Sequence, residues 1–523
     1  MTEKVANNCD APTEANDESE LTSGALAAYE KLARERGILT YKLETLPISG
    51  VGENSYGQVL QVKMTPISTL LVEVVAPFFS VIKMAPKQLN RRKFTRVVDY
   101  YRREVFIYEH VLRTFAEVER TYAISAEMRV DQPPEMYFYS LEPLDEFIIF
   151  EDLQQQHYAQ NPRFNTPNFN LVEKALISLA RMHAMSFVLQ ALRPEQFHDW
   201  VTPMDDNLFS NILPLSVEFG KQHIDCTREM MKTERAKKKV LEVEIKGVTQ
   251  QQRRQSARRR GSVVSAKLLN LLNVVYNDFE RICLRCVDGQ ACAPYAVICH
   301  GDFWNNNIMY HFDAAKNATS AKLIDFQMSR YASPVLDVVH FLFSCTEKEL
   351  RDAHFQEFLD IYYKTLTQHL QHFDLDSDKI YPRSIFEKQL RYYGVYGFCM
   401  SAFCVPFFIS NASEAIDLDE VSTWAVKISD KLPSSPLLSE EENMTSDSEA
   451  ENIDAATRLA QNNNSDSEET EEERICRQKL QEYQVLTERT LPIFKKRMFG
   501  IVVDLVQYDV IDMVETLGKE LPI

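Results

Sequence analysis

The stretch CHGDFWNNNIMY, residues 299–310, decides how the rest of the chain is interpreted. Apolar pairs at 297–298 and 308–309 flank it, a pattern typical of two short buried strands joined by a turn. Between them lie Asp302 and Asn307, five residues apart, and burying such groups without partners costs free energy. The stretch therefore predicts a polar ligand held between the two strands.

Composition narrows the class of protein. The 523 residues predict two or three packed units, and the net charge of −18 argues against nucleic acid or an anionic membrane as the main partner. The first twenty residues lack the apolar segment of a secretory signal, and ten scattered cysteines imply no disulfide framework. The longest apolar run, 393–410, contains two glycines and a proline, so we expect a buried helix and not a membrane span. These features predict a soluble cytoplasmic protein; they do not predict its oligomeric state.

The chain divides into segments of different character. Residues 1–24 are acidic and polar and are expected to be disordered, whereas 25–152 alternate in strand-like patterns around one long helical stretch. From 153 to 523 helical patterns dominate, except for short strands at 296–327. We therefore expect an α+β protein with a small β-rich lobe followed by a large helical lobe.

Two charged segments interrupt the helical region and are interpreted as flexible insertions. Residues 232–267 carry a net charge of +9, and 434–473 are acidic, with −12 over 439–473. Contact between these oppositely charged segments is the alternative, and solvated loops are the preferred interpretation. Each segment contains serines in kinase-acceptor patterns, which are Ser262 in the basic segment and Ser446, Ser448, Ser465 and Ser467 in the acidic one.

Cysteine and histidine residues raise the question of a metal site. Cys283, Cys286, Cys292 and Cys299 have a spacing that zinc ligands can adopt. The first two lie in a stretch of helical periodicity and the last ends a strand-like run, so buried neutral thiols are the preferred interpretation. His183, in an apolar helical stretch, is likewise interpreted as a core residue and not as a ligand.

Moving a phosphoryl group from ATP requires a lysine for the phosphates, oxygen ligands for Mg²⁺ and a base for the attacking hydroxyl. The chain contains such groups in a consistent order. Lys83 ends a strand-like run, Glu104 lies in the long helical stretch that follows, and Asp302 and Asn307 belong to the stretch quoted above. Asp325 follows the apolar run AKLI.

These residues resemble a known family. HGDFWNNN at 300–307, followed by LIDFQ at 323–327, is similar to the small-molecule branch of the protein-kinase-like fold, beside choline kinases and aminoglycoside phosphotransferases. Within that branch the chain resembles the ecdysteroid kinase-like (CHK kinase-like) family over about residues 40–433 and the C-terminal helices. Further matching stretches are GENSY at 52–56, Glu104 with Tyr108, FEDL at 150–153 and LARMHA at 179–184. The resemblance implies a bilobal protein-kinase-like fold.

The resemblance also implies roles for individual residues. Asp302 would be the catalytic base, Asn307 and Asp325 would hold Mg²⁺, and Glu104 would hold Lys83 toward the ATP phosphates. The remaining residues have supporting roles: Asn54 and Ser55 in the phosphate loop, the backbone from Glu151 to Leu153 at the adenine, and His300 and Asp337 as structural supports of the catalytic loop. Trp304 either packs beside the loop or faces the substrate.

The sequence differs from protein kinases at three points. The phosphate loop reads SGVGENSYGQV and lacks the G-x-G-x-x-G pattern, the metal aspartate is followed by Phe-Gln and not Phe-Gly, and no A-P-E segment follows. The last difference makes a protein substrate the weakest of three hypotheses.

The leading hypothesis is an ATP-dependent phosphotransferase that acts on a hydroxyl of a small, largely apolar molecule, by resemblance an ecdysteroid-like compound or a xenobiotic alcohol or glycoside. The alternative is a catalytically weak nucleotide-binding scaffold, or pseudokinase, that uses its charged insertions to bind partners. Residues 185–230 and 385–410, rich in Phe, Met and Tyr, are expected to contact the acceptor.

Overall fold

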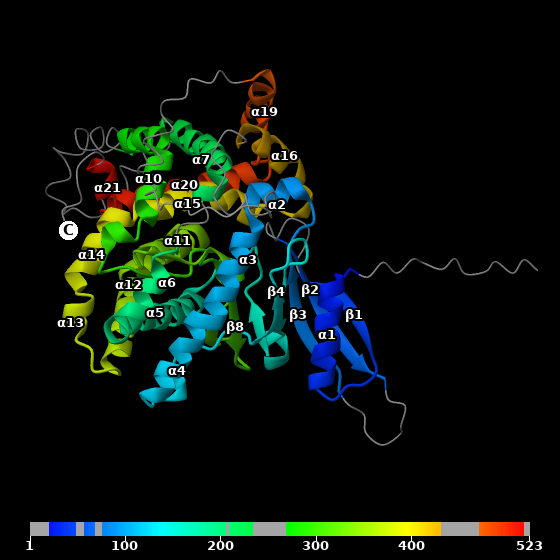
Figure 1. The fold of residues 1–523 in the computed structure, drawn as a ribbon. Coiled ribbons are helices and arrows are strands. Elements are labelled where there is room, and N and C mark those ends of the chain that lie inside the picture. Colours follow the sequence, from blue (N-terminus) through cyan, green and yellow to red (C-terminus); the bar gives the residue numbers. More distant parts are fainter. Residues whose placement is uncertain are drawn as a thin grey trace, which may run out of the picture.

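A computed structural model describes residues 20–48, 57–67, 76–204, 209–233, 268–429 and 470–516. They form a smaller lobe that contains the main sheet and a larger lobe made mostly of helices (Figure 1). The predicted α+β fold with a small β-rich lobe and a large helical lobe is confirmed.

The smaller lobe contains an antiparallel sheet with the strand order β1-β2-β3-β5-β4. In the central strand β3, alternating burial leaves Ser80 and Ile82 fully buried, as expected for a strand with a core-facing side. Helix α1 (Ser23–Glu35) packs on this sheet, where the hydroxyl groups of Tyr29 and Ser80 lie 2.9 Å apart. The strands span Tyr41–Pro47 (β1), Gln58–Pro66 (β2), Phe78–Met84 (β3), Met136–Ser140 (β4) and Phe147–Glu151 (β5).

One long helical segment connects β3 to β4. After the short helix α2 (Leu89–Thr95), α3 (Val97–Phe106) continues through a turn of π-helix at Ile107–Leu112 into α4 (Arg113–Thr121). The sequence predicts a single helix over about the same residues; the structure adds the π-turn, a feature frequent at functional sites.

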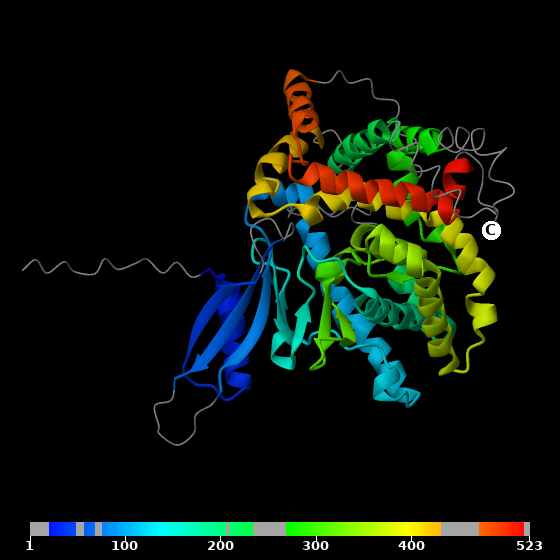
Figure 2. The same cartoon turned by 180° about the vertical axis from the view of Figure 1, so that it is seen from behind.

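The larger lobe is built around α5 (Phe169–Leu192), which packs lengthwise against α12 (Lys348–Gln371). Helices α11 (Val335–Cys345), α15 (Val395–Ile409) and α20 (Thr490–Gln507) form a second packed group, and α20 lies along α15 (Figure 2). The other helices are α6 (Pro194–Val201), α7 (Phe209–Met231), α10 (Phe279–Val287), α13 (Ser377–Ile380), α14 (Arg383–Tyr393), α16 (Leu418–Ser429), α19 (Glu471–Glu482) and α21 (Asp512–Glu515).

By length and hydropathy, α5 could cross a membrane, and so could residues 377–409 if the bent helix pair there formed one span. However, 72% of the most apolar window of α5 is buried in the protein, as in the core helix of a globular domain. The expectation of a buried helix at 393–410 is confirmed, because nearly all of α15 is buried.

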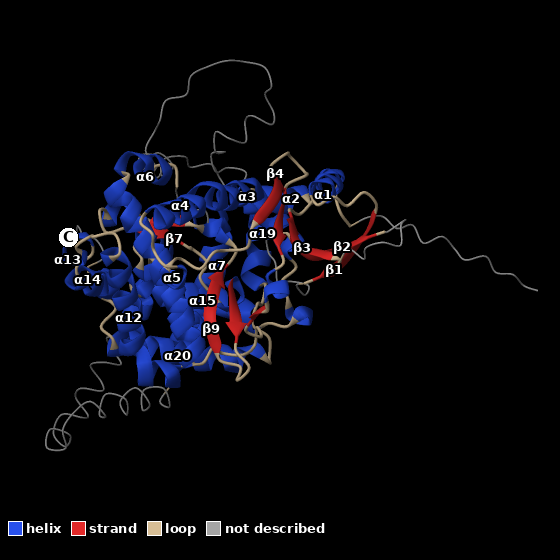
Figure 3. Ribbon diagram, turned by 90° about the horizontal axis from the view of Figure 1, so that it is seen from below, coloured by secondary structure: helices blue, strands red, loops and turns tan. Residues whose placement is uncertain are grey.

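Two small sheets lie within the helical lobe (Figure 3). One has the order β6-β8-β9, and the other pairs β7 with β10. Strands β7, β8 and β9 match the short strands predicted at 296–327, whereas β6 and β10 lie outside that range. They span Tyr158–Gln160 (β6), Val297–Cys299 (β7), Ile308–Phe312 (β8), Ala318–Leu323 (β9) and Arg330–Ala332 (β10).

The edges of the predicted segments differ from the structure at two places. Leu21 is buried and α1 begins at Ser23, inside the stretch 1–24 that we expected to be disordered. At the other end, α19 begins at Glu471, inside the predicted insertion 434–473, because Thr470 and Glu473 form a capping box. Composition does not distinguish these helix starts from disordered segments, because acidic and hydroxyl residues are common in both.

Several predicted residues lie outside the described residues, so their interpretations stay predictions. These are the phosphate-loop residues Asn54 and Ser55 and the serines Ser262, Ser446, Ser448, Ser465 and Ser467.

The cysteines considered as zinc ligands are buried free thiols, in agreement with the preferred interpretation. Burial raises the pKa of Cys286 and Cys299 well above the ordinary value and that of Cys292 to about 12. Among the described residues, the one convergent group of possible ligands joins Cys299 to His183 and Asp337, not to the other cysteines.

Candidate active site

A cavity of about 600 Å³ lies between the two lobes. The sheet contributes Val59, Val81 and Lys83, while the helical lobe contributes the loop after β7 and the residues that follow β9. A second set of lining residues, from the end of α15, is almost entirely apolar. The cavity therefore has a charged half and an apolar half.

Lys83 is the centre of the charged half. Its Nζ donates to a Glu104 carboxylate oxygen at 2.6 Å, to Asp325 Oδ1 at 2.8 Å and to Gln327 Oε1 at 3.0 Å. Lys83 is 8% exposed and Glu104 1%, so this pairing is largely shielded from water. The ammonium carried by β3 is thus surrounded by polar side chains from α3 and from the turn after β9.

The helix that carries Glu104 is fixed by aromatic contacts. Tyr108, one turn further along, packs against Phe150 of β5 with ring centroids 4.9 Å apart and edge-on against Phe326 at 5.6 Å. Phe326 follows Asp325 directly. Packing in the π-turn therefore connects the position of Glu104 to that of Asp325.

Hydrogen bonds to core residues hold the loop after β7 in place. Asp337 on α11 accepts hydrogen bonds from the backbone N–H of His300 at 2.6 Å and of Gly301 at 3.0 Å. The side chain of His300 reaches the carbonyl of Ile324 at 3.0 Å. Gly301 has a φ of +86°, and a Cβ there would lie 1.8 Å from the Met328 carbonyl oxygen, so only glycine fits.

His183 supports the same aspartate. Its ring nitrogens lie 2.8 Å from the Tyr362 hydroxyl and 3.2 Å from Asp337 Oδ2, and the ring is fully buried. Within the group of His183, Cys299 and Asp337, His183 is hydrogen bonded to Asp337, while the Cys299 thiol donates to the backbone carbonyls of Ala332 and Ser333. These contacts agree with the interpretation of His183 as a core residue.

Asp302 and Asn307 face the cavity together. The side-chain Nδ2 of Asn307 donates to Asp302 Oδ2 and to the Asp302 carbonyl, both at 3.0 Å. Since its nitrogen is used in this way, Asn307 has its side-chain oxygen left for another partner. Asp302 is half-buried, and both residues line the cavity.

The register of a hairpin brings Asp325 to the same place. Ile308 at the start of β8 pairs with Leu323 at the end of β9, and the Ile324 N–H donates to the Asn307 carbonyl at 3.0 Å. The residue before β8 and the residue that follows Ile324 therefore meet at one end of the hairpin. Asn307 and Asp325 are neighbours for this reason, although eighteen positions separate them.

Burial governs the protonation of the acids. It raises the pKa of Asp302 to about 7, and the carboxylate of Asp325 acts in the same direction, while the hydrogen bond from Asn307 opposes the shift. Burial also raises the pKa of Glu104, against the attraction of Lys83. Burial disfavours the Lys83 ammonium as well, but the attraction of Asp325 and Glu104 is larger together and keeps its pKa above the ordinary value.

The opposite edge of the cavity is formed by the segment after β5. Glu151, Asp152 and Leu153, which the resemblance places at the adenine, all line the cavity. The Glu151 N–H already donates to the Glu135 carbonyl at 2.8 Å, so it is not a donor for a ligand. Asp152 accepts a hydrogen bond from Gln61 at 2.7 Å, which joins the segment to β2.

The apolar half is lined chiefly by aromatic residues. Trp304 stacks on Phe408 with ring centroids 4.0 Å apart and an angle of 5° between the planes. Phe403 and Phe407 on α15 extend this surface, with centroids 5.5 Å apart. Trp304 thus both packs beside the loop and faces the cavity. The other lining residues of this half include Arg163, Met400, Cys404 and Leu418.

The structure brings most of the predicted site together. Lys83, Glu104, Asp302, Asn307 and Asp325 line one cavity with Glu151 and Leu153, while His300 and Asp337 support the loop from the core. Of the two segments expected at the acceptor, residues 400–408 line the cavity. No described residue of 185–230 does so, because α7 packs behind α15.

Two lining residues were missed by sequence reasoning. Gln327 was noted only as the replacement of a glycine, yet it binds Lys83, and its amide also lies 3.4 Å from Asp325 Oδ2. No sequence pattern indicates a role for Arg163, because it lies in a loop of mixed composition, far in sequence from the residues it faces.

Comparisons with known proteins agree with the resemblance seen in the motifs. The model of the ecdysteroid kinase-like family matches residues 52–375, more than half of the 523 residues. This match confirms the family resemblance on which the protein-kinase-like fold was predicted. No curated protein matches the chain.

Solved structures give weaker matches. The GDP complex of wild-type aminoglycoside 2'-phosphotransferase-IIIa is 11% identical over 76% of this chain and 97% of that chain, with a TM-score of 0.33. The GDP and kanamycin complex of APH(2")-IIia is 12% identical over 76% of this chain and 98% of that chain, with a TM-score of 0.31. TM-scores of this size carry no argument about the site.

Proposed function

Because this chain belongs to the ecdysteroid kinase-like family, we propose that it is a small-molecule kinase that transfers the γ-phosphoryl group of ATP to a hydroxyl of a largely apolar acceptor. The observation that carries the proposal is the composition of the cavity between the lobes. One half holds Lys83 with its two carboxylate partners beside Asp302 and Asn307, and the other half is aromatic.

In the proposed reaction the charged half receives the nucleotide. The Lys83 ammonium, kept charged by Asp325 and Glu104, is held where it can neutralise phosphate oxygens. The backbone at Glu151–Leu153 borders the space for the adenine base. Because the Glu151 N–H is already used, the Glu151 carbonyl and the Leu153 N–H are the groups proposed to bind adenine.

Asp302 is the proposed catalytic base. It orients the acceptor hydroxyl and accepts its proton as the new oxygen–phosphorus bond forms and the bond to the leaving ADP breaks. The hydrogen bond from Asn307 fixes the carboxylate, and the tie of the loop to Asp337 limits its motion. Such positioning supplies much of the rate enhancement in phosphoryl transfer.

The residues present fit Mg²⁺. Asn307 has its side-chain oxygen left after its nitrogen binds Asp302, and the Asp325 carboxylate is about a quarter exposed toward the cavity. Both are hard oxygen donors of the kind this ion prefers. When bound there, the ion would neutralise charge on the phosphates.

The apolar half supports an acceptor with a rigid hydrocarbon body. Its lining includes Arg163 and several aromatic and thioether or thiol side chains, and no acid is among the described residues that form this half. A polycationic acceptor would lack partners there, whereas an apolar alcohol would bury its surface against aromatic rings. An ecdysteroid-like compound or a xenobiotic alcohol or glycoside meets this requirement.

The test is a screen of ATP consumption with the purified protein and steroid, sterol-glycoside and plant-phenolic alcohols, with mass spectrometry of the products. We expect at least one apolar alcohol to gain 80 Da, the mass of HPO₃, and Asp302→Asn to abolish the gain. If ATP binds and no alcohol in any class is phosphorylated, the phosphotransferase proposal fails and the scaffold hypothesis replaces it. The complete set of Lys83, Asp302, Asn307 and Asp325 favours the enzyme, since a scaffold has no need to keep all four together.

A further inference from the structure

The aromatic wall of the cavity lies outside the residues matched by the family model. It is formed by the C-terminal half of α15, which contains Phe403, Phe407 and Phe408, whereas the match ends at residue 375. The wall needs a particular support, because its helix contains an internal proline and ends at Ile409, directly behind the cavity.

The proline leaves a carbonyl that must be bound from outside the helix. Pro406 has no N–H, so the Ala402 carbonyl four residues earlier loses its partner within α15. His223 of α7 lies with Nδ1 2.8 Å from that oxygen and donates to it. Burial lowers the pKa of His223 to about 4, so the ring is neutral near pH 7.

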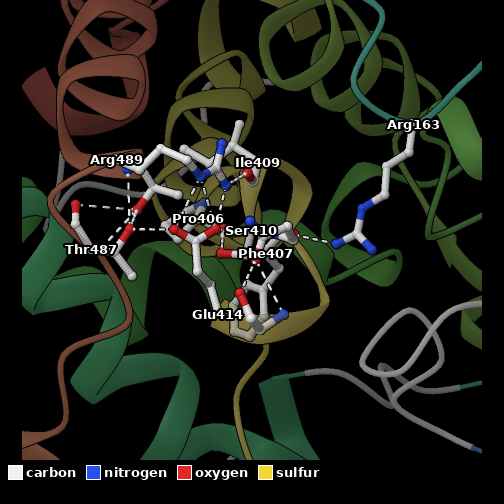
Figure 4. A network of polar contacts seen from close by, with 11 residues as sticks. Arg163, Pro406, Phe407, Ile409, Ser410, Glu414, Thr487 and Arg489 are labelled. Carbon is white, nitrogen blue, oxygen red and sulfur yellow. Dashed lines mark hydrogen bonds and ion pairs between the residues drawn. The ribbon is translucent and has the colours of Figure 1, made fainter.

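The end of α15 is bound by two arginines from distant parts of the chain. Arg489, just before α20, donates to the Ile409 carbonyl at 2.6 Å, and Arg163, before α5, donates to the Phe407 carbonyl (Figure 4). Ser410 binds the Pro406 carbonyl at 2.7 Å. The last carbonyls of a helix lack partners within it and form its negative end, which cations stabilise.

Arg489 is itself held in place. Its Nε lies 3.0 Å from both carboxylate oxygens of Glu414, and Thr487 donates to the same carboxylate at 2.6 Å (Figure 4). Glu414 also accepts the Asn411 N–H at 3.0 Å, which closes the turn after α15. A two-point arginine–carboxylate contact has a fixed geometry that a lysine does not reproduce.

One aromatic stack connects the aromatic wall of α15 to the loop that carries the proposed base. Phe408 lies flat on Trp304, which is two residues beyond the proposed base Asp302. A shift in the end of α15 would therefore change both the shape of the acceptor space and the side chain next to the base. Reaction rates are sensitive to such shifts, and a misplacement of about 1 Å can cost on the order of 10²-fold.

We infer that Arg489 is a positioning residue for the acceptor: by binding the end of α15 and Glu414, it holds the Phe407–Phe408 surface at the distance that an acceptor needs to reach Asp302. This inference rests on the proposed function. It assigns to the segment before α20 a part in acceptor selection, although that segment does not line the main cavity.

The kinetic test uses the best acceptor found in the screen. Arg489→Ala is expected to raise the KM for the acceptor about tenfold, equivalent to ~1.4 kcal/mol, and to leave the KM for ATP within about twofold. Arg489→Lys, which keeps the charge and loses the two-point contact, should recover part of the loss. Arg34→Ala is the matched control, because Arg34 forms an exposed ion pair with Glu30 on α1 in the other lobe.

A second readout does not depend on activity. The chain has three tryptophans, and Trp200→Phe with Trp424→Phe leaves Trp304 as the only one. In that background, acrylamide quenching of Trp304 fluorescence reports access to the stacked ring. We expect Arg489→Ala to increase the quenching constant about twofold, with Arg34→Ala unchanged.

The outcomes separate the two proposals. If no alcohol is phosphorylated by the unmodified protein, the proposed function fails, and the quenching constant alone decides whether Arg489 positions the wall. If Arg489→Ala changes neither the acceptor KM nor the quenching, or raises both KM values equally, the positioning role is wrong. Should Arg489→Ala not fold, as judged by circular dichroism, Glu414→Gln is measured in its place with the same criteria.

Discussion

The two halves of the cavity are built in different ways. The charged half joins Lys83, Glu104 and Asp325 through direct hydrogen bonds of 2.6 and 2.8 Å, all within the residues that the family model matches. The apolar half is a surface formed mainly by rings of α15, with Arg163 as a charged residue of its lining. The position of these rings is set by side chains that bind backbone carbonyls of α15.

The difference has a physical cause. Charges in a poorly hydrated site need partners at fixed distances, so few arrangements of residue types are acceptable. An apolar surface needs only volume and shape, which many side chains can provide. Under the proposed function, the charged half is therefore suited to one nucleotide reaction, and the apolar half is where acceptor preference would change.

The largest effect is expected at the base. Asp302→Asn should lower the turnover number by about 10³-fold, the order expected for loss of a general base, and leave the Kd for MgATP within about threefold. Isothermal titration with the nucleotide and a product assay measure the two quantities. Asp313→Asn, in the exposed turn after β8, is the matched control. Turnover of the Asp302 variant within tenfold of the unmodified protein would exclude its role as base.

Loss of the lysine should have the next largest effect. Lys83→Met should lower kcat/KM for ATP by about 10²-fold, since one charged donor to the phosphates is removed. It should also lower the Tm, because the Glu104 carboxylate would remain buried without its cation. Lys63→Met, in an ion pair with Glu44 on β2 and β1, is the control. A variant with normal ATP kinetics would show that the charged half does not bind the nucleotide.

The apolar half should respond differently. Phe408→Ala removes the ring stacked on Trp304 and should raise the acceptor KM about tenfold, a loss of ~1.4 kcal/mol, with little change in the KM for ATP. Tyr139→Ala, an exposed aromatic of β4, controls for loss of a ring elsewhere. Equal changes in both KM values would mean that the two halves do not act independently.

The smallest effect is expected from loss of the acidic segment. Deletion of 439–469, which spares the capping box of α19, should change the Tm by no more than about 2 °C, because the segment has too few apolar residues to add to a core. Scanning calorimetry and both KM values are the measurements. A large drop in Tm, or a change in either KM, would show that the acidic segment supports one half of the site.

Much of the charged half could be predicted from the sequence. Asp302, Asn307 and Asp325 stand out because polar groups between apolar runs need partners, and the spacing of HGDFWNNN and LIDFQ is specific. Lys83 and Glu104 each look like ordinary residues when taken alone. They predict a nucleotide site only because Asp302, Asn307 and Asp325 follow them in a consistent order. Gln327 was overlooked because its role depends on where the Lys83 ammonium lies.

The sequence by itself determined the two lobes, the order of the charged residues and the burial of α15, because periodicity and isolated charges are local properties of the chain. Only the tertiary structure decided that α15 lines the cavity while α7 packs against α15, and that Arg163 and Arg489 both bind the end of α15. In those contacts, Arg163 and Phe407 are 244 positions apart in the sequence, and Arg489 and Ile409 are 80 positions apart. No local pattern records them, since any arginine near the right carbonyl would satisfy the same hydrogen bond.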